Sequence, residues 1–234
     1  MRFERDMIAP IRQHLLSRWR DALAIEEFGV GYGVADLVAT RPNHAAVARR
    51  KKLGQWASAS HRDEARVLCA LRTGPKAVAE LAQTTGIPLR RLRSNTLRFL
   101  LAQGFTCPET LGVVGLIDDY RPVVREIWAV EAKLKNWYQG LCQARRYQHF
   151  AHRVFLAVPD DRRSVVKNDL LRRLNVGLIA VTSSSARIIL RPRRATPRSE
   201  DLHLMSMERI WGVTQSQSMP AGVSRPRERP QATS

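Results

Sequence analysis

The sequence predicts an α/β protein, a mixed β-sheet flanked by helices and interrupted by a small inserted helical domain. Three observations lead to this class. Short apolar runs typical of strands occur near both ends of the chain, amphipathic helix patterns separate them, and the stretch from 60 to 108 carries helix patterns alone. The 234 residues are enough for one domain that carries a smaller second one.

The N-terminal elements are a helix and a β-hairpin. Apolar side chains recur at spacings of three and four over 4–20, which favours a helix. Strand-like runs follow at 23–30 and 33–40, separated by a glycine-containing turn. Asp36 lies inside the second run among valine, alanine and leucine, where a carboxylate is costly unless it is paired or binds a cation. We therefore expect a functional role for Asp36.

A basic segment follows the hairpin. Residues 41–59 predict an irregular connection that contains four consecutive cationic residues, Arg49, Arg50, Lys51 and Lys52. Two interpretations stay open, a solvated linker and an arm that contacts phosphates.

Residues 60–119 predict a small domain of their own, with helices over 61–72, 76–83 and 89–103. A Thr-Thr-Gly-Ile-Pro turn joins the second helix to the third, and a segment from 105 to 121 could form a wing. This pattern resembles a winged helix-turn-helix unit, whose third helix would contact DNA. That helix presents polar side chains suited to phosphates and base edges: Arg90, Arg91, Arg93, Asn95 and Arg98. A role in protein contacts is the alternative.

The remaining chain predicts a return to the first domain. We expect a strand over 123–133, a helix over 135–151, a strand over 153–158, a helix over 163–174, and strands over 177–182 and 187–191. From about 192 the chain reads as irregular, and 213–234 as a disordered tail. The predicted domains are therefore 1–45 with 120–195, an insert over 60–119, and the tail.

The polar residues of this first domain suggest metal-assisted chemistry. Glu131 and Lys133 are two residues apart in a strand, so both point to one face, and pairing of their strand with the hairpin would bring Asp36 beside Glu131. Two adjacent carboxylates repel each other unless a cation lies between them, and Mg²⁺ binds to such a pair together with water and phosphate. Gln143 and Tyr147 lie four residues apart on one face of the following helix.

This series of residues resembles the PD-(D/E)XK nuclease superfamily with its restriction-endonuclease-like fold, in the branch that carries a QxxxY motif. The resemblance covers about 1–40 and 120–192. It implies that Asp36 and Glu131 hold Mg²⁺ or Mn²⁺, that Lys133 is the catalytic lysine, and that Gln143 and Tyr147 position the site or contact DNA. Glu4 would assist the metal, although an acid at a helix N-terminus is also favoured by the helix dipole.

Composition indicates the partner. The formal net charge is +18, and 33 of the 39 basic residues are arginine, which suits a polyanion. The few aromatic residues favour duplex DNA over single strands. Three scattered cysteines and a charged N-terminus predict a cytoplasmic protein without a membrane span.

We expect a metal-dependent DNA nuclease, which could act as a homodimer. The alternative is a catalytically inert DNA-binding or regulatory protein on the same scaffold.

Overall fold

The computed structural model describes residues 3–31, 33–108 and 110–218, and it divides the chain into two compact units. The first unit joins Met1–Val47 to Arg121–Ser206, and the second joins Ala48–Tyr120 to Met207–Ser234. The first unit is discontinuous because the second is inserted between two neighbouring strands of its sheet. Residues 196–206, which we expected outside the core domain, belong to the first unit.

The first unit is built on a six-stranded mixed sheet with the order β1-β2-β5-β6-β7-β8. Its strands are β1 (Leu23–Gly29), β2 (Val34–Pro42), β5 (Val124–Ala132), β6 (Arg153–Pro159), β7 (Gly177–Val181) and β8 (Ala186–Leu190). The pairs β5–β6 and β6–β7 are parallel, and the other neighbours are antiparallel. The predicted α/β class is confirmed.

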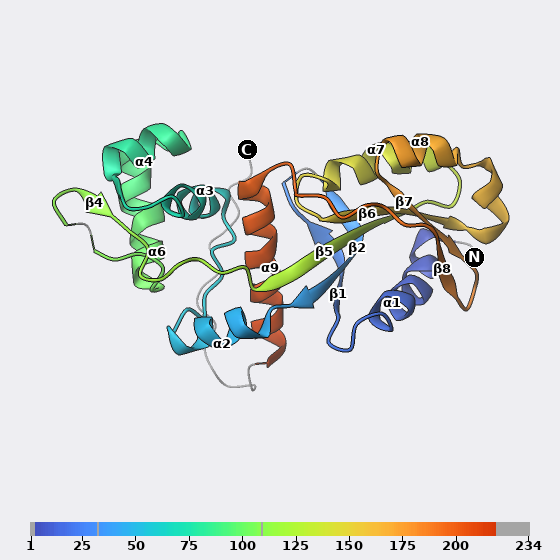
Figure 1. The fold of residues 1–234 in the computed structure, drawn as a ribbon, viewed down its shortest axis with the longest axis horizontal. Helices are drawn as coiled ribbons and strands as arrows, with labels where there is room; N and C mark the ends of the chain where they lie inside the picture. Colours follow the sequence, from blue (N-terminus) through green and yellow to red (C-terminus); the bar gives the residue numbers. More distant parts are fainter. Residues whose placement is uncertain (1–2, 32, 109, 219–234) are drawn as a thin grey trace. The chain divides into compact units, whose positions relative to one another are not determined.

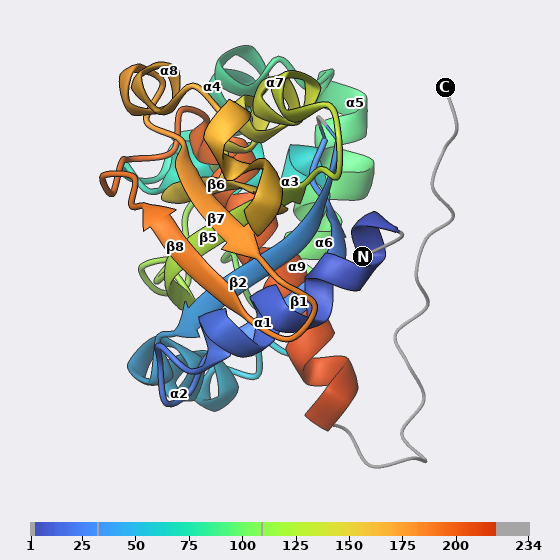
Figure 2. The same cartoon turned by 90° about the vertical axis from the view of Figure 1, so that its right-hand side faces the viewer.

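Helices cover both faces of this sheet (Figures 1 and 2). The 3₁₀ turn η1 (Glu4–Met7) leads into α1 (Ile8–Leu16), which packs on one face, while α7 (Trp137–Tyr147) and α8 (Asn168–Arg173) pack on the other. The core under α1 contains Leu37, Trp128 and Val130. Side chains alternate along a strand, so Asp36 and Glu131 face α7.

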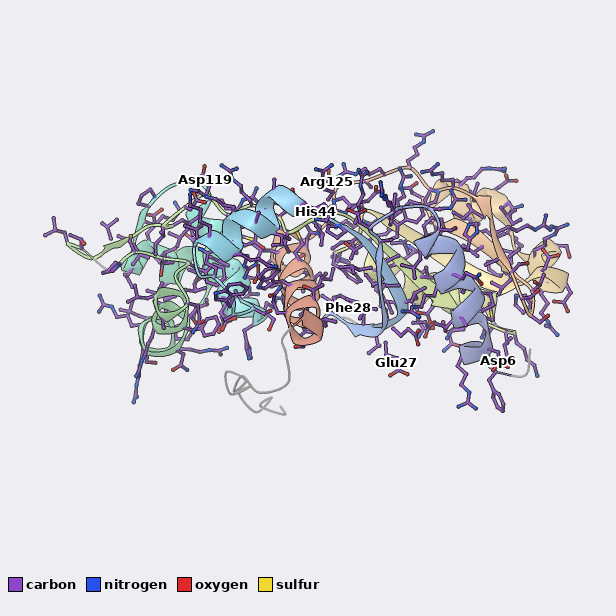
Figure 3. All side chains as sticks on the ribbon, turned by 90° about the horizontal axis from the view of Figure 1, so that it is seen from below. Asp6, Glu27, Phe28, His44, Asp119 and Arg125 are labelled. Carbon is purple, nitrogen blue, oxygen red and sulfur yellow. The ribbon has the colours of Figure 1, made fainter. Side chains whose placement is uncertain are left out.

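The hairpin of β1 and β2 departs from this alternation at Glu26 and Glu27, which are both exposed, and Glu27 has a positive φ of 49°. Glu27 is exposed and projects away from the sheet (Figure 3), whereas Phe28 is 4% exposed. Helix α7 is followed directly by β6, and a further 3₁₀ segment, η3 (Asp160–Val165), precedes α8. The single helix expected over 163–174 is therefore wrong, because the chain is extended at Val166 and leaves η3 and α8 as separate short helices.

The second unit is mainly helical. It contains most of α2 (His44–Lys52), all of α3 (Arg62–Leu71) and α4 (Val78–Thr85), and a longer helix made of α5 (Leu89–Arg91), the π-helical segment η2 (Leu92–Leu97) and α6 (Arg98–Ala102). Strands β3 (Lys76–Ala77) and β4 (Val113–Val114) form a small antiparallel sheet. Gly86 ends α4 at a φ of 67°, in the left-handed region that glycine adopts at little cost.

The C-terminal helix α9 (Glu200–Ser218) is a correction to the sequence analysis. We expected irregular chain from about 192 and a disordered tail over 213–234, but 213–218 are helical. The expected tail beyond 218 lies outside the described residues. Among the helices of the described ranges, none is both long enough and apolar enough to cross a membrane.

Candidate active site

The strand register brings the two predicted acids together. Leu37 pairs with Val130 in the antiparallel β2–β5 ladder, so one further step along both strands places Asp36 opposite Glu131. Directly opposed residues point to the same face of the sheet. Asp36 Oδ2 also accepts a hydrogen bond of 2.7 Å from the backbone N–H of Ala132. The carboxylate of Asp36 is therefore held beside the end of β5.

Glu131 is the most enclosed acid of the site. It is 2% exposed, and its Oε1 lies 3.0 Å from Lys133 Nζ. The hydroxyl of Tyr147 lies 2.5 Å from Glu131 Oε2 and 2.7 Å from the carbonyl oxygen of Val34. A phenol has a single proton to share between two acceptors. Tyr147 therefore fixes the orientation of the Glu131 carboxylate and links α7 to both strands.

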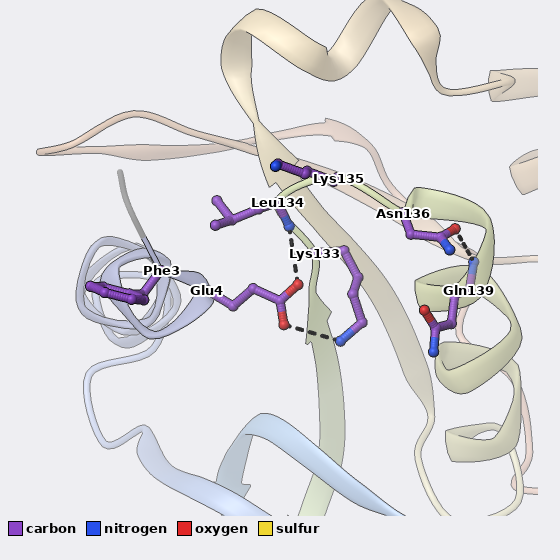
Figure 4. A pocket seen from close by; sticks show the side chains of 7 residues that line it. All are labelled: Phe3, Glu4, Lys133, Leu134, Lys135, Asn136 and Gln139. Carbon is purple, nitrogen blue, oxygen red and sulfur yellow. Dashed lines mark hydrogen bonds and ion pairs between the residues drawn. The ribbon is translucent and has the colours of Figure 1, made fainter.

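Lys133 bridges two carboxylates at the end of β5, and Figure 4 shows its contact with Glu4. Besides Glu131, its Nζ contacts Glu4 Oε2 at 3.2 Å, and the other oxygen of Glu4 accepts from the backbone N–H of Leu134 at 3.3 Å. Burial acts to lower the pKa of Lys133, but the hydrogen bonds and charges of Glu131 and Glu4 outweigh it and raise that pKa. The amine is therefore an ammonium at neutral pH, suited to stabilising negative charge rather than to removing a proton.

The pKa values of both strand acids are raised. Burial is the largest cause for Asp36, and the charges of Glu4 and Glu27 add to it. Burial also raises the pKa of Glu131 most, with Asp36 adding repulsion. Each carboxylate thus pays a desolvation cost that the single ammonium does not cancel. A further cation between them would relieve both the repulsion and the poor solvation.

The first turn of α7 completes the site. Asn136 Oδ1 accepts from the backbone N–H of Gln139 at 3.1 Å and so caps the helix. A Cβ on Gly140 would lie 2.5 Å from Lys133 Cγ, so only glycine lets α7 approach this closely. Asn136 and Gly140 were not predicted from the sequence. The polar residue before a helix pattern was a readable cap signal, whereas nothing in the sequence identified Gly140.

Gln143 lies one turn before Tyr147 on α7. Its side-chain oxygen is buried, and within the described residues it accepts no hydrogen bond. Buried acceptors are rarely left without a donor, so this oxygen marks a place for a group that the protein itself does not supply.

An open pocket of about 490 Å³ lies at this end of the sheet. It is lined by Phe3, Glu4, Lys133, Leu134, Lys135, Asn136 and Gln139 (Figure 4). Lys133 thus connects the pocket to the two strand acids. The lining of the pocket combines the amine side chains of Lys133 and Lys135 with the carboxylate of Glu4.

The donor set fits a hard divalent cation only in part. Across residues 3–31, 33–108 and 110–218, no three His, Cys, Asp or Glu side chains form a group able to hold a metal. Asp36 and Glu131 supply two carboxylates, which is the number that Mg²⁺ commonly takes from protein alongside water and phosphate. Glu4 reaches the same site through Lys133, because its two oxygens accept hydrogen bonds from Lys133 Nζ and from the backbone N–H of Leu134.

The predicted recognition helix presents its polar residues to solvent. The five predicted side chains are exposed, namely Arg90, Arg91, Arg93, Asn95 and Arg98. The opposite side of the helix, with Leu92 and Leu100, is buried. Arg91 forms an ion pair with Asp63 on α3, which fixes one guanidinium of this face.

The basic run at 49–52 needs a correction. It is the last part of helix α2 instead of an irregular connection. Arg50 is 4% exposed and binds Glu208 through two hydrogen bonds of 2.6 and 2.7 Å, so the prediction that it contacts DNA is wrong. Arg49 pairs with Asp118 at 2.8 Å, while Lys51 and Lys52 are exposed.

Comparisons with known proteins add little. No family model matches the chain, and neither does any curated protein. A solved structure described as "SPO1766 protein of unknown function from Silicibacter pomeroyi" matches with 19% identity and a TM-score of 0.27. The match covers 57% of this chain and 96% of that one.

Proposed function

We propose that the protein is a Mg²⁺-dependent DNA nuclease that hydrolyses phosphodiester bonds. One observation carries this proposal: the buried Glu131 and the half-buried Asp36 stand opposite each other on adjacent strands, and an ammonium lies 3.0 Å from Glu131. The raised pKa values of Asp36 and Glu131 support a site that favours a cation. The arrangement agrees with the roles that the PD-(D/E)XK resemblance implies.

In this proposal Asp36 and Glu131 hold the metal, with Mn²⁺ as a substitute. A bound Mg²⁺ supplies a water of lowered pKa and neutralises charge on the phosphate. Lys133 remains protonated and stabilises negative charge that develops on the phosphate oxygens. Tyr147 orients Glu131, Glu4 positions Lys133, and the open acceptor of Gln143 can take a hydrogen bond from a bound water.

The second unit would hold the DNA. Three helices and a two-stranded sheet support its assignment as a winged helix-turn-helix, with the exposed face of α5, η2 and α6 against the duplex. Arginine on such a face contacts phosphates and guanine edges, and Asn95 can contact adenine. The net charge of +18 supports binding of a polyanion.

A plasmid-nicking assay with Mg²⁺ or Mn²⁺ tests the proposal. We expect the wild type to nick supercoiled DNA, and Asp36→Asn, Glu131→Gln and Lys133→Met to lose about 100-fold or more of that activity while still binding DNA. Glu26→Gln is the matched control, because Glu26 is an exposed acid on β1 of the same sheet. A wild type that binds the plasmid but leaves it intact with every divalent metal would refute the nuclease.

A second function has one observation in its favour. The ammonium of Lys133 already lies between Glu131 and Glu4, so the site balances part of its own charge without a metal. This favours a catalytically inert DNA-binding protein. Calorimetric titration with Mg²⁺ separates the two functions, because only the nuclease predicts binding that Asp36→Asn abolishes.

A further inference from the structure

The segment from 191 to 199, called here the strap, is irregular but firmly attached to the first unit. Its backbone N–H groups donate to carbonyls in the connection between α7 and β6: Ala195 to His152 at 3.0 Å, and Arg198 to Gln148 at 3.0 Å. Arg193 forms two further bonds with the Asn175 side chain, of 2.8 and 3.1 Å. Because the strap directs its backbone polar groups at the protein, its side chains remain at the surface.

These side chains are mainly arginines. Arg191, Arg193, Arg194 and Arg198 are exposed on the strap, and Arg145 and Arg146 are exposed at the C-terminal end of α7. Arg125 lies close to this region, because its carbonyl oxygen accepts from the Arg194 side chain at 3.5 Å. We name the group Arg145, Arg146, Arg193 and Arg198 the arginine track.

The arginine track lacks the anionic partners that other arginines of this unit have. Arg163 and Arg187 share Asp160, and Arg153 pairs with Glu126 at 2.8 Å. In the described part of the chain, no carboxylate pairs with any member of the track. The helix dipole favours cations at the end of α7, which explains Arg145 and Arg146 but not the strap. Clustered like charges destabilise a fold, so this surface is suited to an external polyanion.

The outer face of α7 connects the track to the candidate active site. Gln139 lines the pocket, and the exposed positions Cys142, Arg145 and Arg146 follow it at helical spacing. Six or seven residues of helix span about 10 Å. The end of the track on α7 therefore lies within a few phosphates of the pocket along a bound DNA strand.

We propose that the arginine track binds the DNA backbone beside the phosphate that occupies the pocket, as a second contact surface separate from the recognition helix. The inference rests on the DNA-binding part of the proposed function and not on cleavage. It assigns a positioning role to the strap, because a DNA strand held at the arginine track has a neighbouring phosphate placed at the pocket of the same unit.

Fluorescence anisotropy with a labelled duplex, in EDTA so that no cleavage occurs, tests this inference. Two variants probe the track from different elements, Arg193→Gln/Arg198→Gln and Arg145→Gln/Arg146→Gln. The matched control is Arg12→Gln/Arg20→Gln, which removes the same charge from exposed positions on α1 and just after it, on the other face of the sheet.

Each track variant should flatten the slope of log affinity against log salt by up to about 1.8, since each lost phosphate contact contributes about 0.9. The dissociation constant at about 0.1 M salt should rise by up to roughly 60-fold, while the control stays close to the wild type. Unchanged track variants, or a control that weakens binding equally, would overturn the inference. If DNA binding depends on the track but the wild type never cuts DNA, the nuclease proposal is refuted and the inference stands.

Discussion

Replacing Arg50 by methionine should cost the second unit much of its stability. Arg50 donates to both oxygens of Glu208, which is 0% exposed, and to the carbonyls of Gln55 and Ala57 at 3.1 and 2.8 Å. Without the guanidinium, Glu208 keeps its hydrogen bond from Tyr120 at 2.6 Å but has no countercharge. Breaking a buried ion pair from one side costs about 3–5 kcal/mol.

That loss is a large part of the roughly 5–15 kcal/mol that stabilises a typical domain. Urea unfolding followed by tryptophan fluorescence measures it, because the Trp211 ring lies 4.8 Å from the Arg50 guanidinium. The double variant Arg50→Met/Glu208→Met should recover much of the loss, since an apolar pair of similar volume replaces a buried ion pair at little cost. An Arg50→Met variant as stable as the wild type would refute the reasoning.

Three other predictions concern the first unit. Asp36→Asn should raise the melting temperature at about pH 8 but not near pH 3. Burial raises the pKa of Asp36 above its usual 3.8, so the folded protein loses stability as pH rises from 3.8 through the raised pKa and the carboxyl ionises. In His152→Gln, the urea midpoint should fall less between about pH 7 and pH 4.5 than it does in the wild type. Burial lowers the pKa of His152 from 6.5 to about 4, so the wild type loses stability as pH falls through that range. Gly140→Ala should lower the melting temperature by the equivalent of about 1–3 kcal/mol through its clash with Lys133, although alanine usually stabilises a helix.

The sheet and the central residues of the site were predictable because both follow from local patterns. Two strand-like runs separated by a glycine-containing turn located the hairpin, and the spacing of Glu131 and Lys133 put both on one face. Asp36 was identifiable by the cost of a carboxylate among apolar neighbours. The pairing of β2 with β5 across the inserted unit was a further assumption, and the register confirms that it places Asp36 opposite Glu131.

The failures at α9 and Arg50 share a physical cause, which is burial that leaves no one-sided pattern. Leu202, Met205, Ser206 and Glu208 of α9 are all buried, so this helix is enclosed around much of its circumference and shows little amphipathic periodicity. Arg50 was misplaced for a related reason. In a run of four cationic residues, no sequence signal identifies Arg50 as the one that pairs with an acid 158 residues later, Glu208.

The charge balance of the site bears on the choice between the two proposed functions. Within reach of one another, Glu4, Asp36 and Glu131 present three carboxyl groups to the single ammonium of Lys133. An otherwise strongly basic protein thus has an acidic centre beside its pocket. At that centre, Asp36 and Glu131 would repel a phosphate that arrives without a metal. A protein that only binds DNA gains nothing from this repulsion. A divalent cation converts the same two acids into an attractive site for a phosphate, which is why the acidic pair favours the nuclease over the inert binder.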